Sequence, residues 1–411
     1  MRVLFVSPYI YAPQYEEHSK NKTGFGMMVY DIASSIGHKG NEVRVIVNTF
    51  GKERKCDGFV ITRHSLLSAL IHGRYCGLYK FNRILKKNKI KSKNRIRYLF
   101  YYMNIGYIER VIKKFKPEIV HIHGMEVYTN VLSAFLKENG IAFVVTLHGL
   151  LQNDEFPSLL EKNIEKTFIR ESFSKRIPIT VISSKMKERF LGEYYGATDV
   201  NNVSVITNGT SMRKENLCKS EDRCSKYCIP KDRKIVLVIG SICKRKNQSM
   251  VVRAIEKLPR EKKEQLCVFF LGVDMTDGTI QEEIENRGMT GIIKVMGFVP
   301  QTELGFFYEH ADLNIVASID EGFGLSMIEG FIHGVPTLCF SDLDAIDDLY
   351  DEQAMLLCEK RDVKVFSDMI ALGIEKKWDK DVIRRHGEKF SLEKLSERYI
   401  EKYHEIIAEM K

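Results

Sequence analysis

Short apolar runs rich in β-branched residues alternate along the chain with longer stretches in which apolar residues recur every three or four positions. The short runs are typical of buried strands, and the longer stretches are typical of amphipathic helices. Helical spacing is clearest in Met27–Ile36 and Ile105–Phe115. In the first half of the chain the pattern predicts strands at Val3–Val6, Val43–Val47, Ile119–His121, Phe143–Leu147, Ile179–Ile182 and Val203–Ile206.

The same rhythm begins again after a polar stretch, residues 213–232, which we interpret as a linker. Further strands are predicted at Ile235–Ile239, Val268–Leu271, Ile293–Val295, Leu313–Val316, Pro336–Phe340 and Ala354–Leu357. Alternation of strand and helix indicates parallel sheets covered on both faces. Because 411 residues exceed what one core usually organises, we expect an α/β protein with two Rossmann-like, doubly wound domains. Such domains would face each other across a cleft at the carboxyl ends of their strands.

The net charge of +9 comes from one segment. Residues 59–108 hold 11 of the 63 lysines and arginines and none of the 54 acidic residues, and aromatic residues are interleaved with the cations. Such a segment suits an anionic surface, either lipid headgroups or nucleic acid, and a solvated helical insertion is the plainer alternative. Because no nucleic-acid-binding module is recognisable, an anionic membrane surface is the expected partner of this basic insertion, about 63–116.

The remaining composition favours an ordinary globular protein. No apolar run approaches the ~20 residues of a membrane-spanning helix, and the N-terminus reads as a buried first strand rather than a signal peptide. We therefore expect a cytoplasmic protein, peripheral at the inner face of the cell membrane if the basic segment binds lipid. The nine cysteines are expected to be reduced thiols, and the spacing of Cys218, Cys224 and Cys228 lacks the C-x2-C pairs of a zinc site.

The stretch DEGFGLSMIEGFIHGVP, residues 320–336, is the strongest candidate for a binding site. It follows a predicted strand with a glycine-rich turn and then helical spacing. Gly322 and Gly324 lack a Cβ, so a ligand can approach the backbone there. The amides of Phe323, Gly324 and Leu325 would form an anion site at the start of the helix, between Glu321 and Glu329. On its own, the pattern is more typical of a helix with a favourable acid in its first turn and an unrelated exposed glutamate.

Seven segments, in order and spacing, resemble the family-4 glycosyltransferases of the GT-B fold, whose E-x7-E motif stands where Glu321 and Glu329 stand here. The segments are TGFGMMVYDIASSIGHKGNEVRVIV, VVTLHGL, VISSKMKERF, VSVITNGT, LVIGSICKRKNQSMVVRAI, ADLNIVASIDEGFGLSMIEGFIHGVP and FSLEKLSERYIEKY. The resemblance implies an acceptor-side domain at 1–212 and a nucleotide-sugar domain at 233–389. It also implies a final helix, 390–411, that crosses back to the first domain.

The resemblance implies a retaining glycosyltransferase of the hexosyltransferase type. It would move a sugar from a nucleotide-sugar, used as a co-substrate, to the hydroxyl of a glycan or lipid-linked acceptor, without a metal ion or other cofactor. Three residues are implied to be catalytic: His148, which contacts the sugar, Lys246, which holds the diphosphate, and Glu321, which orients the sugar. The donor-binding residues are Gly24, Gly26, Ser241, Arg245, Gly322, Phe323, Gly324, Leu325 and Glu329, the last on the ribose.

This sequence departs from the family pattern at two loops. The family usually has an arginine where Ser241 stands, so either Arg245 compensates or the diphosphate is held more weakly. The family's S-x-x-G-G-x-x-E segment is SDLDAIDD here, without glycines. Its Asp342 and Asp344 are interpreted as caps of a following helix rather than as a metal site.

Residues of the first half have plainer alternatives. Gly24 and Gly26 follow the first strand and open a helix, where their amides would meet phosphate or acceptor, or simply form a tight turn. His148 ends a strand at its carboxyl edge and would otherwise be a loop histidine. His121 and His123 flank Ile122, so only one is expected to face a given side of the strand, and both are interpreted as structural.

The function expected from the sequence is synthesis of cell-surface polysaccharide or glycolipid. The main alternative is a non-catalytic nucleotide-sugar-binding partner of another transferase, which Ser241 keeps open. A sugar epimerase of the same fold is a third hypothesis, disfavoured by the E-x7-E segment, and nucleic-acid binding is a fourth.

Overall fold

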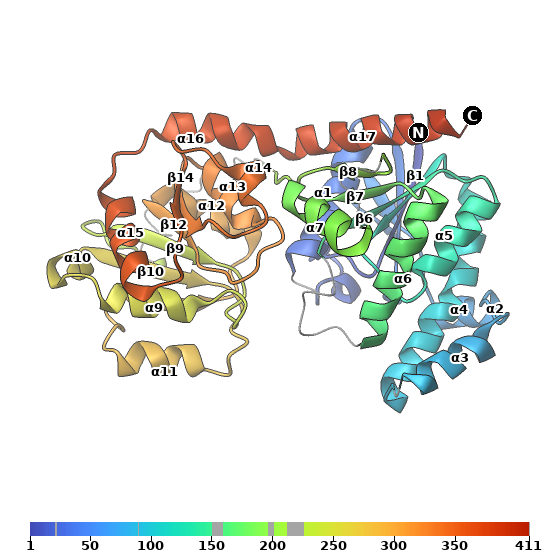
Figure 1. Cartoon of the computed structure of the whole chain (residues 1–411), viewed down its shortest axis with the longest axis horizontal. Helices are drawn as coiled ribbons and strands as arrows, with labels where there is room; N and C mark the ends of the chain where they lie inside the picture. Colours follow the sequence, from blue (N-terminus) through green and yellow to red (C-terminus); the bar gives the residue numbers. More distant parts are fainter. Residues whose placement is uncertain (21–22, 89, 150–158, 196–200, 212–225, 411) are drawn as a thin grey trace. The chain divides into compact units, whose positions relative to one another are not determined.

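The computed structural model describes residues 1–20, 23–88, 90–149, 159–195, 201–211 and 226–410. The chain forms two compact units (Figure 1). The first contains Met1–Thr207 and Leu392–Lys411, and the second contains Asn208–Ser391. Each is built around its own predominantly parallel sheet. The predicted fold class, two Rossmann-like α/β domains, is therefore confirmed.

The first unit has an eight-stranded sheet in the order β3-β4-β2-β1-β5-β6-β7-β8, in which only the short edge strand β3 runs antiparallel. Its strands are β1 (Arg2–Ser7), β2 (Glu42–Val47), β3 (Arg54–Lys55), β4 (Phe59–Ile61), β5 (Ile119–His123), β6 (Phe143–Leu147), β7 (Ile179–Val181) and β8 (Val203–Val205). The helices are α1 (Gly24–His38), α2 (Leu66–Ile71), α3 (Leu78–Lys87), α4 (Ser92–Phe115), α5 (Thr129–Glu138), α6 (Leu159–Lys175), α7 (Ser184–Tyr195) and α17 (Leu392–Glu409).

The second unit has a six-stranded, all-parallel sheet in the order β11-β10-β9-β12-β13-β14. Its strands are β9 (Lys234–Ile239), β10 (Leu266–Leu271), β11 (Ile293–Gly297), β12 (Leu313–Val316), β13 (Thr337–Phe340) and β14 (Met355–Cys358). Its helices are α9 (Gln248–Glu256), α10 (Arg260–Glu264), α11 (Thr279–Asn286), α12 (Gln301–His310), α13 (Leu325–Ile332), α14 (Ile346–Leu349), α15 (Val363–Glu375) and α16 (Lys380–Gly387).

All twelve predicted strands are present, and their ends lie within two residues of the predictions. Their continuous apolar character has a direct cause, because helices cover both faces of the sheet. In β10 every residue is buried, and Figure 1 shows α9 and α11 on one face of the second sheet with α12 and α13 on the other. A central strand buried on both sides reads as an unbroken apolar run rather than an alternating one.

Helix α17 belongs to the first unit, where it packs on α1 and the sheet. Its Tyr399 and Tyr403 are fully buried. The hydroxyl of Tyr403 lies 2.6 Å from Nδ1 of His121, and Nε2 of the same ring lies 2.6 Å from Oγ1 of Thr146. His121 is therefore a structural residue that ties the last helix to the sheet.

The expectation that only one of His121 and His123 faces a given side of β5 is wrong. Residues two apart in a strand point to the same face, because the side-chain period is two. Both rings are buried, and they stack with centroids 3.8 Å apart. His123 therefore shares the environment of His121 and continues it toward the carboxyl end of the strand.

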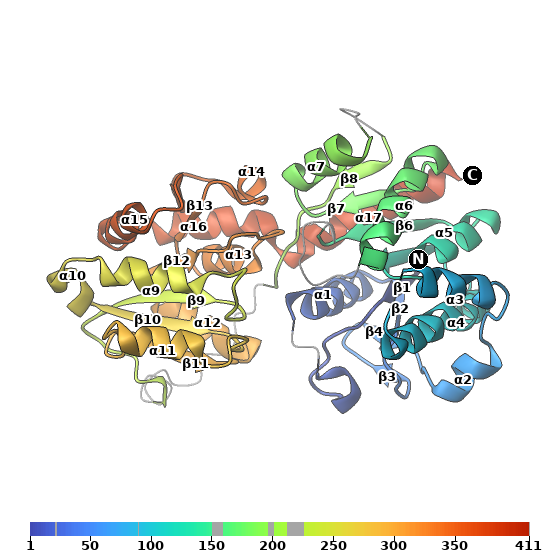
Figure 2. The same ribbon diagram turned by 60° about the horizontal axis from the view of Figure 1, so that its bottom comes forward.

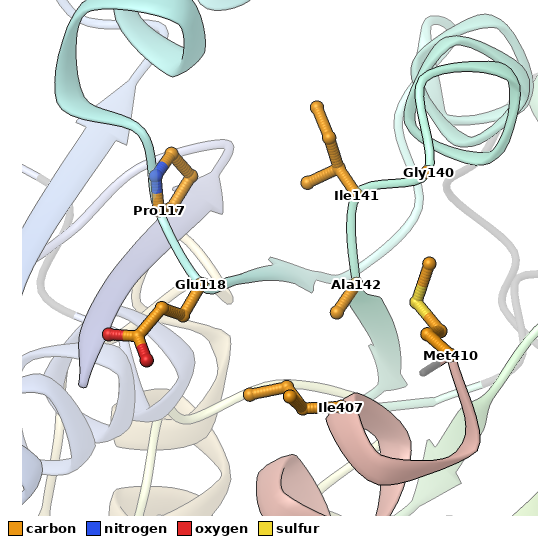
Figure 3. Close-up of a pocket in the computed structure, with 7 residues that line it drawn as sticks. All are labelled: Pro117, Glu118, Gly140, Ile141, Ala142, Ile407 and Met410. Carbon is orange, nitrogen blue, oxygen red and sulfur yellow. The ribbon is translucent and has the colours of Figure 1, made fainter.

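A hollow of about 250 Å³ lies at the opposite, amino-terminal edge of the first sheet (Figure 3). Its wall comes from the segments that precede β5 and β6 and from the end of α17. The lining residues are Pro117, Glu118, Gly140, Ile141, Ala142, Ile407 and Met410. None of the residues predicted to bind the donor lines this hollow.

Candidate functional site

In the second unit, two loops at the carboxyl edge of the sheet are joined to each other. One runs from β9 to α9 and contains Arg245, and the other runs from β12 to α13. The amide of Ile319 donates to the carbonyl of Arg245 at 2.8 Å, and Nη1 of Arg245 donates to the carbonyl of Asp320 at 3.0 Å. Nδ2 of Asn247 donates to the carbonyl of Ala317 at 3.3 Å. The loops predicted separately from the phosphate-loop and E-x7-E segments thus form one structure.

Lys246 and Glu321 form an ion pair between these loops, Nζ to Oε2. The side chains are only 16% and 12% exposed. Burial by itself would raise the pKa of Glu321, but the Lys246 ammonium, helped by the Ser318 hydroxyl that donates to Oε2 at 3.0 Å, lowers that pKa below its ordinary value. Glu321 is therefore ionised at neutral pH, and the pair is a fixed charge pair at the edge of the sheet.

Gly240 lets the Lys246 side chain reach Glu321. Its φ is +131°, a conformation that side chains rarely adopt. A Cβ at this position would lie 3.2 Å from Cε of Lys246. The backbone conformation at the end of β9 thus favours glycine, and any side chain there would make a tight contact with the side chain of Lys246.

The turn before α13 leaves the start of that helix without a side-chain cap. Gly324 is the N-cap residue, with φ +71° and ψ 63°, so it sits in the left-handed region that favours glycine. Phe323 anchors the turn, because its ring is buried and lies 6.4 Å from the ring of Phe390. Gly322 and Leu325 are half-buried. An uncapped helix start combines unpaired amides with the positive end of the helix dipole, as an anion site requires.

Glu329 lies in the second turn of α13 and is held from α12. The hydroxyl of Tyr308 lies 3.1 Å from Oε2 of Glu329 and also 3.1 Å from the carbonyl of Ser326. Tyr308 is buried and stacks on His333, with centroids 5.3 Å apart. Burial raises the pKa of Tyr308 well above its ordinary value, so its hydroxyl remains a donor. The Glu329 carboxylate is therefore oriented, not merely exposed.

Sequence reasoning missed Arg361, which braces the turn that carries Glu321. Its guanidinium binds Asp342 through two hydrogen bonds of 2.9 and 2.8 Å and donates to the carbonyl of Ser318 at 2.9 Å. It also lies 4.3 Å over the ring of Phe340. The interpretation of Asp342 as a helix cap is wrong, because this carboxylate pairs with Arg361 and α14 begins without a side-chain cap. No local pattern marks contacts between residues so far apart in sequence.

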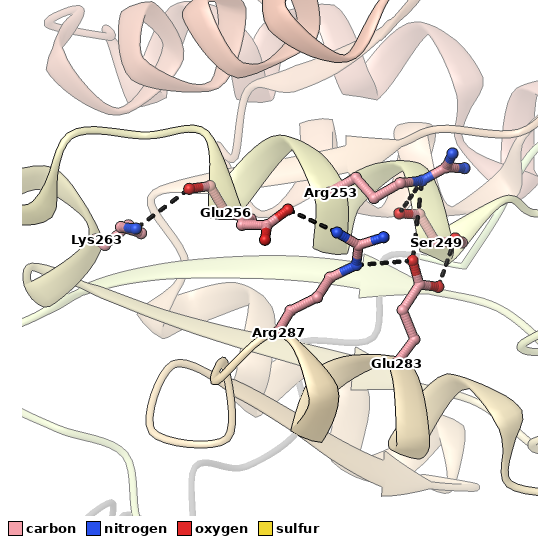
Figure 4. A network of polar contacts seen from close by, with 6 residues as sticks. All are labelled: Ser249, Arg253, Glu256, Lys263, Glu283 and Arg287. Carbon is pink, nitrogen blue, oxygen red and sulfur yellow. Dashed lines mark hydrogen bonds and ion pairs between the residues drawn. The ribbon is translucent and has the colours of Figure 1, made fainter.

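Ser241 is half-buried, and its carbonyl accepts from Nε2 of Gln248 at 3.1 Å. The fold of this loop thus depends on α9, which a polar network anchors to its neighbours (Figure 4). Arg287, which follows α11 directly, donates to Glu256 at 2.7 Å and to Glu283 at 3.1 Å. Ser249 of α9 also donates to Glu283, at 2.5 Å. These contacts fix the helix that carries the loop and are structural.

In the first unit, the glycine-rich start of α1 lies beside His148. The hydroxyl of Thr23 caps the helix by accepting from the amide of Gly26 at 3.2 Å, so that amide already has a partner. Gly24 is exposed. The ring of Phe25, between the two glycines, lies 5.0 Å from the His148 ring in an edge-on contact. The predicted residues of this unit therefore form one cluster at the carboxyl edge of its sheet.

His148 is paired with His123. Nε2 of His148 and Nδ1 of His123 lie 3.2 Å apart, and the rings stack with centroids at 5.5 Å. Burial lowers the pKa of His148 to about 3, so the ring is neutral at physiological pH. Nδ1 of His148 has no partner among the described residues. His123, interpreted from the sequence as a structural residue, therefore lies directly against a predicted site residue.

Two negative findings apply to the described part of the chain. It contains no cluster of three or more His, Cys, Asp or Glu side chains that could hold a metal ion. No helix within it combines the length and the apolar character that crossing a bilayer requires. Cys218 and Cys224 lie outside the described residues, whereas Cys228 is exposed and its carbonyl accepts from Lys294 at 2.8 Å.

Solved structures share this fold across their whole length. A glycosyltransferase from Rickettsia africae ESF-5 covers 99% of this chain and 98% of its own, with a TM-score of 0.70 at 19% identity. Anabaena HepE, solved in complex with UDP, covers 98% of this chain and 100% of its own, with a TM-score of 0.66 at 14% identity. The architecture of two Rossmann-like units is thus that of the GT-B fold.

Two family models match adjoining parts of the chain. "Glycosyltransferase Family 4" matches residues 23–214, and "Glycosyl transferases group 1" matches residues 220–390. Together they span most of the sequence, and the chain belongs to the group 1, family 4 glycosyltransferases. The O-antigen chain mannosyltransferase B of Escherichia coli is 26% identical over 172 residues, which are 41% of this chain and 45% of that relative. The family predicted from the sequence is confirmed, and with it glycosyltransferase as the enzyme class. Retention and independence of a metal ion stay predictions.

Proposed function

We propose that the protein transfers a sugar, of the hexose type, from a nucleotide-sugar to an acceptor hydroxyl with retention at the anomeric carbon. The single observation that carries the proposal is the Lys246–Glu321 pair beside the uncapped start of α13. It places a cation, an anion and free helix amides at one edge of the second sheet. A sugar diphosphate needs all three groups. Its phosphates are anionic and bind a cation and amides, whereas its sugar hydroxyls donate hydrogen bonds to a carboxylate.

The leaving nucleoside diphosphate gains negative charge as the sugar bond breaks. Lys246 and the amides from Gly322 to Leu325 would stabilise that charge, since preorganised donors act most strongly where charge develops. A metal ion is not needed for this task. Glu321 would accept hydrogen bonds from the donor sugar, and its ionised state suits that role. Ser241 and Arg245 would contribute from the neighbouring loop.

Glu329 would bind the ribose of the donor. Its carboxylate is oriented by Tyr308, and a carboxylate can accept from two neighbouring hydroxyls. UDP is the nucleotide present in the HepE complex. The proposed role of Glu329 is the same whichever base the donor carries.

His148 would contact the transferred sugar as a neutral hydrogen-bonding group. Burial keeps its pKa far below neutrality, so the ring is unsuited to donating a proton as a general acid. Gly24 and Gly26 lie in the same cluster, on the acceptor side. Because no residue stands out as a covalent nucleophile, we infer front-face displacement, in which the leaving phosphate helps to deprotonate the acceptor.

The acceptor is proposed to be a glycan or lipid-linked molecule in cell-surface polysaccharide or glycolipid synthesis. The E. coli relative named above is an O-antigen chain mannosyltransferase, which supports this class of pathway. The protein would then work in the cytoplasm, peripheral to the inner face of the membrane.

The second candidate is a non-catalytic nucleotide-sugar-binding partner of another transferase. Ser241, which stands where the family usually has arginine, favours it. Slow hydrolysis of the donor distinguishes the two candidates. A transferase can transfer the sugar to water and so release nucleoside diphosphate, whereas a binding partner cannot. Release that is abolished by Glu321→Gln supports transfer. Tight donor binding with no release at any enzyme concentration would favour the binding partner.

A further inference from the structure

The first unit carries an unusual concentration of exposed apolar side chains. Among the described residues, 18 large apolar side chains are exposed, and eight of these lie between residues 66 and 96. They are Leu66, Leu67, Leu70, Ile71, Tyr75, Tyr79, Ile84 and Ile96. Single exposed apolar residues are ordinary, but a cluster of this kind marks an interaction site. We call this set, with the cations described below, the α2–α4 surface.

Helix α2 presents most of the aliphatic part. Leu66 and Leu70 are four residues apart, as are Leu67 and Ile71, so the four side chains form two adjacent rows on one side of the helix. They are between 44% and 68% exposed. Ala69, on the opposite side, is fully buried. A six-residue helix therefore buries its smallest apolar residue and exposes its four largest, which is the reverse of what folding alone favours.

Exposed cations occur in the same segment as these apolar side chains. The exposed ones are Arg63, Lys80, Arg83, Lys86, Lys87, Lys91, Lys93 and Arg97. On α3 the exposed cations are interspersed with the exposed side chains of Tyr79 and Ile84. Phe81 and Leu85 of the same helix are buried. No acidic residue occurs in residues 59–108. The nearby carboxylates are engaged within the fold, since Glu109 pairs with Arg74 and Glu161 accepts from Tyr98 at 2.8 Å.

The α2–α4 surface rests on a firm base. Figures 1 and 2 both show α2 and α3 lying against α4. The ring of Phe81 stacks on Tyr102 with centroids 4.9 Å apart, and the Tyr102 hydroxyl donates to the carbonyl of Cys76 at 3.0 Å. Gly106 of α4 lies so close to the loop after α2 that a Cβ would come within 2.2 Å of the His72 carbonyl. The exposed apolar side chains are therefore held outward by packing beneath them.

We propose that the α2–α4 surface docks onto an anionic lipid bilayer, with the aliphatic side chains of α2 inserted among the headgroups. Cations that suit anionic headgroups and Leu or Ile side chains that suit the acyl boundary occur together on interfacial helices. Single-stranded nucleic acid is served by cations and aromatic rings, and gains nothing from four exposed aliphatic side chains. The charge on the surface also opposes pairing with a second copy of itself.

The α2–α4 surface and His148 lie at the same edge of the first sheet. Helix α2 follows the carboxyl end of β4, and His148 follows the carboxyl end of β6 in the same sheet. Both strands belong to the parallel set, so both ends lie at one edge. Docking would bring that edge toward the headgroups, where a lipid-linked hydroxyl resides. This last step rests on the proposed function, but docking itself does not.

The test is sedimentation of the full chain with vesicles, without any substrate. Wild-type protein should bind vesicles of phosphatidylcholine mixed with phosphatidylglycerol and bind weakly to phosphatidylcholine alone. Leu67→Ser/Ile71→Ser should weaken binding about tenfold or more, since each buried aliphatic side chain contributes substantially. Lys86→Gln/Lys87→Gln should weaken it about tenfold and reduce the difference between the two vesicle types. All four positions are exposed, so the variants should fold.

Leu372→Ser/Lys377→Gln, which alters an exposed leucine and lysine in the second unit, is the matched control and should bind as wild type. Equal binding by all variants would overturn the proposal. Binding of RNA by a protein that does not bind vesicles would also overturn it. A dimer, detected by light scattering, that the variant Leu67→Ser/Ile71→Ser dissociates would overturn it as well. Donor-induced thermal stabilisation, measured on the same proteins, is independent of docking. Loss of vesicle binding with that stabilisation intact would therefore reject the surface without touching the proposed function.

Discussion

Lys246 and Glu321 are 75 positions apart in sequence and form a largely buried ion pair at the edge of the second sheet. The pair joins the loop after β9 to the turn before α13. It therefore joins two motifs that look independent in the sequence. In the proposed reaction, each partner faces a different part of the donor, so the pair sets the distance between diphosphate and sugar before the donor binds.

The ion pair should stabilise the second unit only as a pair. Removing one partner leaves an uncompensated buried charge, so Lys246→Met should lower the free energy of unfolding by about 2–4 kcal/mol. The double variant Lys246→Met/Glu321→Gln should lose less than the single variant. Denaturant unfolding of wild type, Lys246→Met, Glu321→Gln and the double variant completes a double-mutant cycle and measures the interaction free energy of the pair. Additive losses would mean that the two side chains do not interact in solution.

Arg361 should act as a positioning residue for donor binding. Arg361→Ala frees the Ser318 carbonyl and Asp342, so the turn carrying Glu321 loses its brace. We expect the KM for the donor to rise about tenfold or more while the KM for the acceptor stays constant. Lysine cannot reproduce the two-pronged contact, so Arg361→Lys should not restore activity.

Methylguanidinium added to Arg361→Ala should restore part of the donor affinity, because it can occupy the vacated site. Arg384→Ala is the matched control, since Arg384 forms an exposed ion pair with Asp381 in the same unit. A uniform loss of activity in Arg361→Ala, with no change in donor KM and no rescue, would assign Arg361 to stability alone.

We expect Gly240 to matter for donor binding because it leaves room for the Lys246 side chain, in addition to adopting a backbone conformation that favours glycine. Gly240→Ala brings a methyl group to 3.2 Å from the lysine side chain and should weaken donor binding. Gly278→Ala imposes a similar conformational strain, at φ +87°, but has no atom within 4 Å of the new Cβ. Both should lose about 1 kcal/mol of stability, and only the first should lose donor affinity. Calorimetric titration of both variants with the donor distinguishes the two effects.

Glu126, which follows β5 in the first unit, predicts a pH dependence. Burial, followed by the charge of Glu161, raises its pKa from an ordinary value of 4.5 to about 7, and Arg97 opposes this only in part. The folded state therefore holds a proton that the unfolded chain releases between pH 4.5 and 7. Stability should fall as pH rises through that window, and the full loss applies above it.

Glu126→Gln removes this ionisation. It should stabilise the protein by about 1–3 kcal/mol at pH 8 and have little effect near pH 4.5. Unfolding curves at the two pH values measure the difference. Glu138→Gln, an exposed carboxylate on the neighbouring helix α5, should show no such dependence. A stabilisation by Glu126→Gln that is equal at both pH values would contradict a raised pKa.

The sequence predicted the sheets well because buried parallel strands leave a strong local signal. Leu266–Leu271 is an apolar run whatever its partners, and Val43–Val47 is apolar except for Arg44. The pairing of both strands follows from the alternation with helices. Strands β3 and β4 were missed, because runs of two and three residues are too short to carry such a signal. The same holds for α2, whose exposed leucines do not follow the helical pattern of a buried face.

Motifs in the sequence predicted individual residues of the candidate site but not the contacts between them. Lys246, Glu321 and Glu329 could be named from motifs, but their partners Ser318 and Tyr308 could not. Those contacts depend on where separate elements meet in space. Arg361 is the clearest case, because it touches residues 19 and 43 positions away through side chain and carbonyl groups that no spacing rule connects.

A sugar diphosphate is proposed to bind at the start of α13 beside Lys246. The most direct measurement is isothermal titration with a panel of nucleotide-sugars, using wild type, Lys246→Met and the exposed neighbour Lys244→Met as control. We predict that wild type and Lys244→Met bind one nucleotide-sugar with equal affinity and that Lys246→Met binds it at least about tenfold more weakly. Equal affinity for that ligand in all three proteins would contradict the account.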